Sequence, residues 1–185
     1  MLQLNHKLHL KYAITRFWNL STILGLFSMM IDDVALEAIP EICLGMTSRL
    51  ASRMTTKVFG VLLAPLGLDA TQFPIMVMLR QHPDIVVLAL SKILDIEASG
   101  ISRNVQVLER KGLVISSGGR GRNGKRLSLS PNGHEILDQA VRCWRDAQKM
   151  LIAELGETET IEVRRTMKKL NDAAQRILVR TRGLA

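Results

Sequence analysis

A glycine-rich run in the middle of this 185-residue chain carries four cations and no carboxylate. The run GGRGRNGKR covers residues 118–126 and contains Arg120, Arg122, Lys125 and Arg126. Short stretches with alternating apolar residues flank it and predict a β-hairpin. A basic hairpin tip gains little from a protein core and much from phosphate oxygens and an electronegative groove. The pattern indicates a nucleic-acid-binding wing over residues 116–127.

The segment directly before the hairpin is predicted to form a helix over residues 98–111, ending at Gly112. At 100° per residue, its apolar face carries Ile101, Val105 and Leu108. The opposite face carries groups that pair with base edges or phosphates, namely Ser99, Ser102, Arg103, Gln106 and Arg110. An ordinary solvated helix has a similar face. The neighbouring basic hairpin favours a recognition helix that enters the DNA major groove.

Regular helical patterns surround these two elements. Apolar residues recur every four positions between Glu41 and Leu63, and a proline and a glycine end that helix. Thr71 is predicted to N-cap the next helix, which closes at residues 82–84. A short helix over residues 87–94 and a turn at Asp95 follow. Pro131 begins a long helix that breaks at residues 156–158, and a final helix completes the chain.

Composition and charge agree with a DNA-binding protein. The net charge of +8 suits an anionic partner, whereas 4% aromatic residues provide little for RNA recognition by stacking. With 185 residues, of which 47% are hydrophobic, the chain is long enough to bury a core. Two cysteines, Cys43 and Cys143, cannot build a disulfide framework, which favours reduced thiols and a cytoplasmic location.

Residues 1–40 are predicted to be an N-terminal extension, helical in its apolar part. The run from Phe17 to Ile31 would bury Trp18, Leu24, Phe27 and Met30 against another helix or a second subunit. It is interrupted by polar residues and too short for a membrane span, so no membrane partner is expected. A start codon at Met29, Met30 or Met46 is the alternative explanation.

The long helices carry more apolar surface than one small winged domain covers. We therefore expect a two-fold homodimer that is built from the N- and C-terminal helices. The expected segments are an extension (1–40), a dimerisation and connecting helix (41–68), a winged helix-turn-helix lobe (69–130) and C-terminal dimerisation helices (131–185). The predicted fold class is mainly α with a small β-hairpin wing.

Three stretches of the chain resemble the MarR family of bacterial transcriptional regulators, namely LAPLGLDATQF, GISRNVQVLERKGLV and RLSLSPNGHEIL. The resemblance covers residues 41–174. It implies a dimeric winged-helix protein that binds a pseudo-palindromic operator in double-stranded DNA, usually as a repressor, and that a small-molecule effector releases. By position, Ser99, Gly100, Ser102 and Arg103 fall where the family faces the major groove. Arg122 falls on the wing arginine that reaches the minor groove.

The wing departs from the family pattern. Where the family commonly has Asp-Arg-Arg, this chain has Gly121-Arg122-Asn123. The aspartate that orients the wing arginine is missing, which predicts a more mobile wing whose work is shared by Arg120, Lys125 and Arg126. Stronger general phosphate attraction and a less certain sequence preference are expected. The usual threonine after the second strand is Ser130, and the first 40 residues have no family counterpart.

Three alternatives remain beside an effector-released regulator. A peroxide sensor of this family would use Cys43 with Cys143, although Gly45 stands at the expected register and the surrounding tyrosines are absent. A non-specific architectural DNA binder would not need the hydroxyl and amide groups of the polar helix face. An enzyme is disfavoured, because no catalytic or cofactor motif is present and His6 and His9 lack a third metal ligand. No metal and no cofactor are expected.

Overall fold

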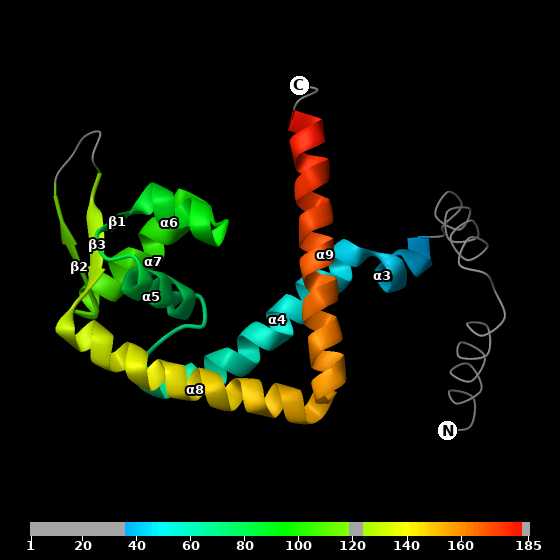
Figure 1. Cartoon of the computed structure of the whole chain (residues 1–185), viewed down its shortest axis with the longest axis horizontal. Coiled ribbons are helices and arrows are strands. Elements are labelled where there is room, and N and C mark those ends of the chain that lie inside the picture. The colour runs from blue at the N-terminus through cyan, green and yellow to red at the C-terminus, as the bar shows by residue number, and fades with distance from the viewer. Residues whose placement is uncertain (1–35, 119–123, 183–185) are drawn as a thin grey trace. The chain divides into compact units, whose positions relative to one another are not determined.

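Helices of very different length and one small sheet make up the described chain, which comprises residues 36–118 and 124–182 of this computed structural model (Figure 1). The elements are η1 Leu36–Ala38, α3 Ile39–Ile42, α4 Leu44–Leu63, η2 Ala64–Leu66, α5 Gln72–Gln81, β1 Ile85–Val86, α6 Val87–Leu94, α7 Ala98–Arg110, β2 Val114–Ser117, β3 Arg126–Leu129, α8 Pro131–Leu155 and α9 Glu157–Arg182. The predicted class, mainly α with a small hairpin wing, is confirmed. The chain forms two units, residues 1–52 and 53–185.

The first unit is described from Leu36 onward, so most of the expected extension lies outside the described residues. The expectation of one continuous helix from Glu41 is wrong. Proline lies in the first turn of α3, which ends at Ile42, and Cys43 adopts an extended conformation with ψ of 108°. The carbonyl of Cys43 then accepts from the amides of Met46 and Thr47, at 3.1 and 3.0 Å, and α4 begins at Leu44.

The second unit contains α5, α6, α7 and the sheet. Helix α5 begins differently from the expectation. Thr71 precedes α5 as predicted, but its side chain makes no capping hydrogen bond to the helix. Instead the backbone N–H and hydroxyl of Thr71 donate to Oδ1 of Asp69, at 2.8 and 2.7 Å. These two bonds lower the pKa of Asp69 below its ordinary value. Asp69, not Thr71, therefore organises the turn into α5.

Helices α6 and α7 agree closely with the sequence. Helix α6 has the predicted bounds, and Asp95 makes the turn with a φ of 52°. Gly112 ends the recognition segment in the left-handed region, at a φ of 69°. The apolar stripe of α7 is fully buried, and its core neighbours come from α5, α6, β3 and α8: Ile75, Met76, Leu79, Leu90, Leu127, Leu129 and Leu137. This burial fixes which face of α7 is presented to solvent.

A third strand joins the predicted hairpin. The sheet has the antiparallel order β1-β3-β2, with Ile85 opposite Leu127 and Val86 opposite Arg126. The edge beside β1 is held by Asp84, whose backbone N–H donates to Oγ of Ser128 while its carboxylate accepts from that hydroxyl, both at 3.0 Å. Two residues are too short to show an alternating pattern, so the sequence contained no signal for β1.

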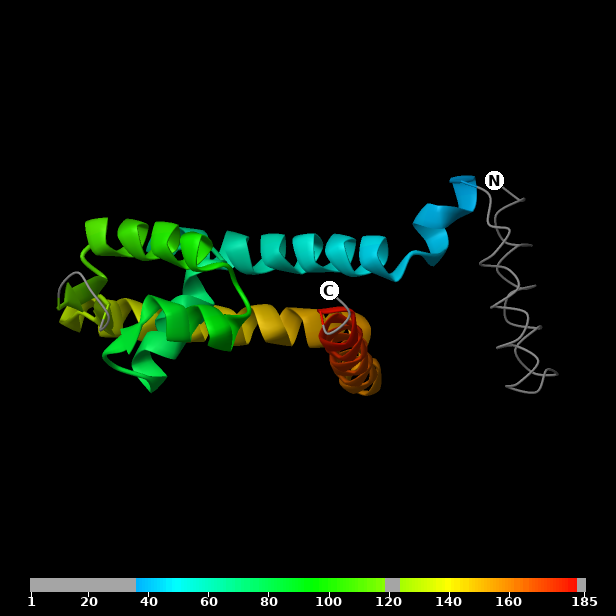
Figure 2. The same cartoon turned by 90° about the horizontal axis from the view of Figure 1, so that it is seen from above.

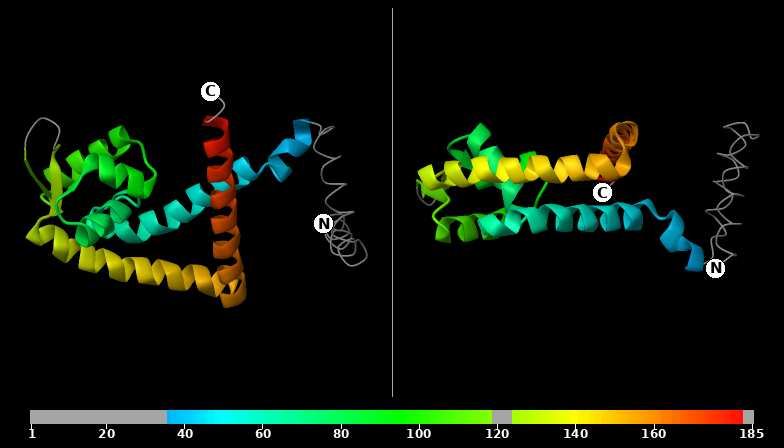
Figure 3. Two further views of the ribbon diagram at one scale, coloured as in Figure 1. Left: turned by 45° about the horizontal axis from the view of Figure 1, so that its top comes forward. Right: turned by 90° about the horizontal axis from the view of Figure 1, so that it is seen from below.

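Ser130 connects the wing to α8. Its hydroxyl accepts from the N–H of Gly133 at 2.9 Å, as an N-cap, and donates to the carbonyl of Gly112 at 2.6 Å. Gly133 is buried because α8 passes directly over the backbone of Leu113 at this point. Figure 2 shows the sheet and helices α5–α7 gathered at the N-terminal end of α8. At the other end Gly156, with a φ of 90°, makes the predicted break, and α8 and α9 meet at a sharp corner (Figure 3).

Candidate nucleic-acid interface

The solvent face of α7 carries the polar groups that the sequence places there. Ser99, Arg103, Gln106 and Arg110 are exposed, directly opposite the buried apolar stripe. Within the described residues, neither Arg103 nor Gln106 has a hydrogen bond or an ion pair. A guanidinium and an amide held on a rigid helix and not used by the protein itself are available to a ligand. These groups match the donors and acceptors on base edges.

The remaining two predicted residues of α7 are partly occupied by local structure. The hydroxyl of Ser102 donates to the carbonyl of Ala98 at 2.8 Å, so its oxygen is left to accept a further hydrogen bond. Gly100 is half-buried, and a Cβ at this position would lie 3.3 Å from Cγ2 of Ile96. Glycine therefore permits the turn before α7 to pack closely against the helix, a role that the sequence reasoning did not identify.

At the base of the wing, the described cations do have partners. Lys125 donates through Nζ to Oε1 of Glu109 on α7 at 2.7 Å, and Ser116 of β2 donates to the same oxygen at 2.6 Å. The loop itself contains no carboxylate, and the partner of Lys125 comes from the preceding helix. Burial by itself would raise the pKa of Glu109, but the hydrogen bonds from Lys125 and Ser116 outweigh it and lower the pKa.

Arg126 opens β3 and is exposed. Its guanidinium donates through Nη1 to the carbonyl of Asp84 at 3.3 Å, which leaves its other donors available. Arg120 and Arg122 lie outside the described residues, so their predicted positions stay predictions. Gly118 and Gly124, which flank that segment, both have positive φ, at 83° and 53°. These two glycines supply the conformations needed where the hairpin leaves its strands.

A second polar cluster, which the sequence reasoning missed, joins α5 to α8. Arg80 forms an ion pair through Nη1 with Asp138, and its Nε and Nη2 lie 3.3 and 3.2 Å from Nδ1 of His134. The hydrogen bond from Arg80 lowers the pKa of Asp138 and raises the pKa of Arg80. The residues are more than fifty positions apart, and periodicity alone does not reveal such a pairing.

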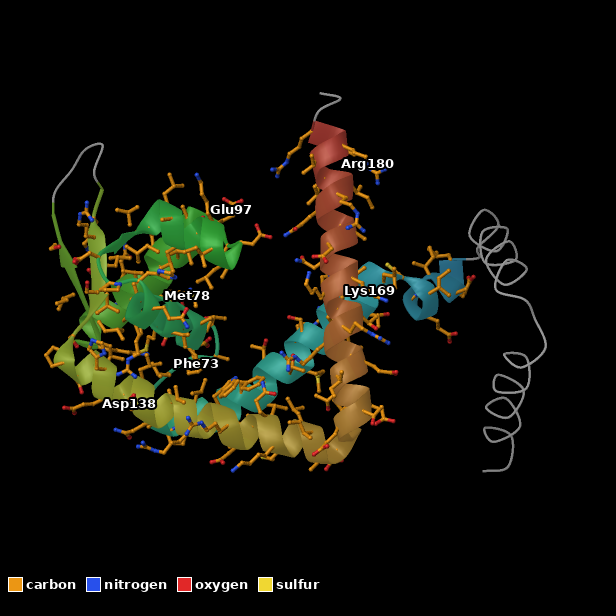
Figure 4. All side chains as sticks on the ribbon, viewed as in Figure 1. Phe73, Met78, Glu97, Asp138, Lys169 and Arg180 are labelled. Carbon is orange, nitrogen blue, oxygen red and sulfur yellow. The ribbon has the colours of Figure 1, made fainter. Side chains whose placement is uncertain are left out.

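A pocket of about 560 Å³ lies within the second unit, between the end of α4, α5 and α8. Apolar side chains make most of its wall, including Phe59, Leu63, Phe73, Val77, Met78 and Trp144. Phe73 and Met78 project from α5 in Figure 4. Thr56 and Gln148 are its polar lining residues, and no charged side chain lines it. Met76 of α5 does not line the pocket and is a core residue with 0% exposure.

The two thiols are free and half-buried. Cys43 lies at the interruption before α4, and Cys143 lies on α8 and packs against the core. In residues 36–118 and 124–182, no group of three or more His, Cys, Asp or Glu residues is arranged to hold a metal ion. In the same ranges, no helix is both long and apolar enough to cross a membrane.

Comparison with known proteins finds similarity to regulators of transcription. A family model described as MarR family matches residues 66–123. The crystal structure of the Mycobacterium tuberculosis transcriptional regulator MosR shares 30% identity, covers 74% of this chain and 98% of its own, and superimposes with a TM-score of 0.65. The same regulator in complex with DNA also shares 30% identity, covers 72% and 96%, and has a TM-score of 0.64.

A more distant likeness extends to other regulators of the same fold. Sco5413 from Streptomyces coelicolor, described as a MarR family transcriptional regulator, is 19% identical over 74% of this chain and 96% of its own, with a TM-score of 0.64. At that identity the likeness concerns the fold alone. Among curated proteins, no sequence matches this chain.

Proposed function

Because this chain belongs to the MarR family of transcriptional regulators, we propose that it represses transcription by binding a specific double-stranded DNA operator as a homodimer. The observation that carries the proposal is the solvent face of α7. There Arg103 and Gln106 stand unpartnered among the described residues, on a helix whose other face is locked in the core. Family members act as regulators, which agrees with the expectation that this protein is not an enzyme.

In the proposed complex α7 lies in the major groove. Ser99, Gly100 and Ser102 approach the bases closely, while Arg103 and Gln106 reach base edges with donors and acceptors. The wing lies along the adjacent minor groove and contributes Arg120, Arg122 and Arg126. The DNA-bound crystal form of MosR, a relative at 30% identity, supports DNA as the partner.

The chemistry of α7 favours sequence-specific binding over architectural binding. An architectural protein needs only cations along its DNA-facing surface, because phosphate contacts carry no sequence information. On α7 the exposed face mixes hydroxyl, amide and guanidinium groups. The helix contains no lysine, and its cations are Arg103 and Arg110. Hydroxyls and amides add little to phosphate attraction but discriminate among bases.

Selection of bound duplexes from a random DNA pool with the purified full chain tests this function. We expect enrichment of a pseudo-palindromic sequence with half-sites about one helical turn apart. Enrichment without a shared sequence would identify an architectural binder, and recovery no better than with heat-denatured protein would exclude DNA binding. Placing the selected site across a promoter then tests repression directly, since a repressor lowers and an activator raises transcript output.

Dimerisation would cover the apolar surface that the described chain leaves exposed. Large apolar side chains are exposed along α4 and α9: Leu44, Met46, Leu50, Met54, Val61, Ile161, Val163, Met167, Ile177, Leu178 and Val179. Many exposed apolar side chains along two helices favour an interaction surface there. A two-fold dimer buries one face of each helix against its equivalent and gives two recognition helices for a palindromic site.

We expect sedimentation at micromolar concentration to give a dimer, and Leu178→Asp to raise its dissociation constant at least about tenfold, since an unpaired buried carboxylate is costly. Lys169→Asp is the control, because Lys169 is exposed and lies nine residues before Leu178, which places it on the opposite side of α9. A parent chain that stays monomeric at this concentration would refute the assembly.

For the effector we propose a neutral, largely apolar ligand in the α4–α5–α8 pocket. A volume of about 560 Å³ falls in the range of small-molecule sites. Phe59, Phe73 and Trp144 offer aromatic surface, and Thr56 and Gln148 offer one or two hydrogen bonds. The wall lacks a charged side chain, so an anionic ligand would lose its hydration without gaining a partner.

Helix α5 would couple such a ligand to DNA. Phe73 and Val77 line the pocket, while Ile75, Met76 and Leu79 of the same helix are buried in the core beneath α7. A ligand that separates α5 from α8 therefore moves the recognition helix with it. Release of DNA requires that the ligand bind more tightly to the DNA-free arrangement than to the DNA-bound one.

Two fluorescent probes of similar shape test the pocket's chemistry. We expect neutral N-phenyl-1-naphthylamine to bind at least about tenfold more tightly than anionic 8-anilino-1-naphthalenesulfonate at high salt, because the charge has no partner there. Val77→Trp should fill the pocket and abolish binding of the neutral probe. Leu88→Trp, at an exposed position of α6 outside the pocket, should leave it unchanged. Equal affinities, or full binding to Val77→Trp, would contradict the proposal.

A further inference from the structure

One carboxylate oxygen links the recognition helix by hydrogen bonds to both sides of the wing, at β2 and beside β3. Oε1 of Glu109, in the last turn of α7, accepts from Ser116 on β2 at 2.6 Å and from Lys125, next to β3, at 2.7 Å. The Glu109 side chain is 22% exposed and that of Lys125 is 49% exposed, so the pair is only partly screened by water. Both donors lie at the end of the sheet nearest the loop.

Glu109 also occupies an electrostatically unfavourable position that Lys125 offsets. A carboxylate at the C-terminal end of a helix is repelled by the helix dipole, and a nearby cation reverses that effect. The strand edge beside β1 is held separately by Asp84 and Ser128. Glu109 is thus the side-chain link between α7 and the loop end of the wing within the described residues.

We propose that Glu109 is a positioning residue for DNA binding, which fixes the wing against the recognition helix and withholds the charge of Lys125 from phosphate. The inference rests on the proposed DNA-binding function. It reassigns Lys125 from the direct phosphate contact that its sequence suggests to part of an internal pair.

Two consequences for DNA recognition follow. A wing already held at its working angle loses less conformational freedom when it binds, which favours the matched site. A compensated Lys125 releases no counterion, which lowers attraction to every sequence alike. Both effects widen the difference between operator and random DNA, so Glu109 raises specificity without contacting a base.

The salt dependence of binding to a scrambled duplex, measured for single and double variants, tests whether Glu109 keeps Lys125 from phosphate. Glu109→Gln keeps the acceptor oxygen and frees Lys125, so the slope of log affinity against log salt should steepen by about 0.9. Between 50 and 200 mM salt this adds about a 3.5-fold loss of affinity. Lys125→Met should leave the slope nearly unchanged, and the double variant should resemble the parent. Glu135→Gln, an exposed carboxylate on α8, controls for net charge.

Hydrogen exchange without DNA tests the positioning independently. Glu109→Ala should speed exchange of the β2 and β3 amides roughly tenfold, with α8 unchanged, because both charged hydrogen bonds are lost. A Lys125→Met slope that falls by about 0.9 while Glu109→Gln has no effect would make Lys125 a direct phosphate contact and overturn the proposal. Unchanged exchange in Glu109→Ala would also overturn it. A parent chain that binds no DNA would instead refute the proposed function. Hydrogen exchange would still show whether Glu109 holds the wing against α7.

Discussion

Arg103→Ala is expected to lower affinity for the selected operator by about 5- to 150-fold, or about 1–3 kcal/mol. The difference in affinity between operator and scrambled DNA should become smaller. Arg103 is exposed at the centre of the polar face of α7 and has no partner among the described residues, so its removal leaves the protein's own contacts intact. The loss therefore reports a contact with DNA. Titration of operator and scrambled duplexes at several salt concentrations measures it.

Two comparison variants make the result specific. Arg145→Ala removes the same group from an exposed position on α8 and should leave operator binding within about twofold. Arg122→Ala, in the wing, should weaken both duplexes more evenly and lower the salt slope by about one unit. If Arg103→Ala binds both duplexes like the parent, α7 does not read the bases and the proposed mechanism is wrong.

Gly133→Ala is expected to destabilise the fold by about 3 kcal/mol or more. A Cβ built on Gly133 would lie 2.0 Å from the carbonyl oxygen of Leu113, which is backbone and cannot move aside as a side chain would. The clash sits where Ser130 connects the turn after α7 to the start of α8. The free energy of unfolding, from urea denaturation followed by circular dichroism, measures the effect.

Gly60→Ala is the matched control, because Gly60 lies within α4 and nothing stands within 4 Å of its added Cβ. Alanine should stabilise that helix by about 0.5–1 kcal/mol, since glycine is the poorer helix former. The two glycine substitutions thus have opposite expected signs. A Gly133→Ala chain as stable as the parent would mean that α8 does not cross Leu113 as closely as described.

Most helix boundaries could be predicted from local sequence, because the signals that start and stop a helix act within a few residues. Helix α6 has its predicted bounds, and α7 ends one residue before the predicted end. Gly112 and Gly156 have the positive φ expected of residues that end helices. The apolar stripe of α7 was equally predictable, since a period of 3.6 residues determines which side chains share a face.

The errors arose where a distant or unusual partner decides the local conformation. Strand β1 exists because β3 pairs with it about forty residues later, and two residues carry no periodicity of their own. Cys43 interrupts an otherwise regular four-residue repeat because its carbonyl begins α4 from an extended conformation. Asp69 displaces Thr71 as the turn's organiser because its carboxylate takes both donors of that threonine.

For the site, sequence by itself determined which residues are polar, which are basic and which helix face carries them. Tertiary structure decided which of the described cations are free. Arg103 is unpartnered, whereas Lys125 meets Glu109, 16 residues away, and Arg80 meets Asp138, 58 residues away. Periodicity describes the faces of one element, while ion pairing depends on the distance between two elements, which only packing of the core sets.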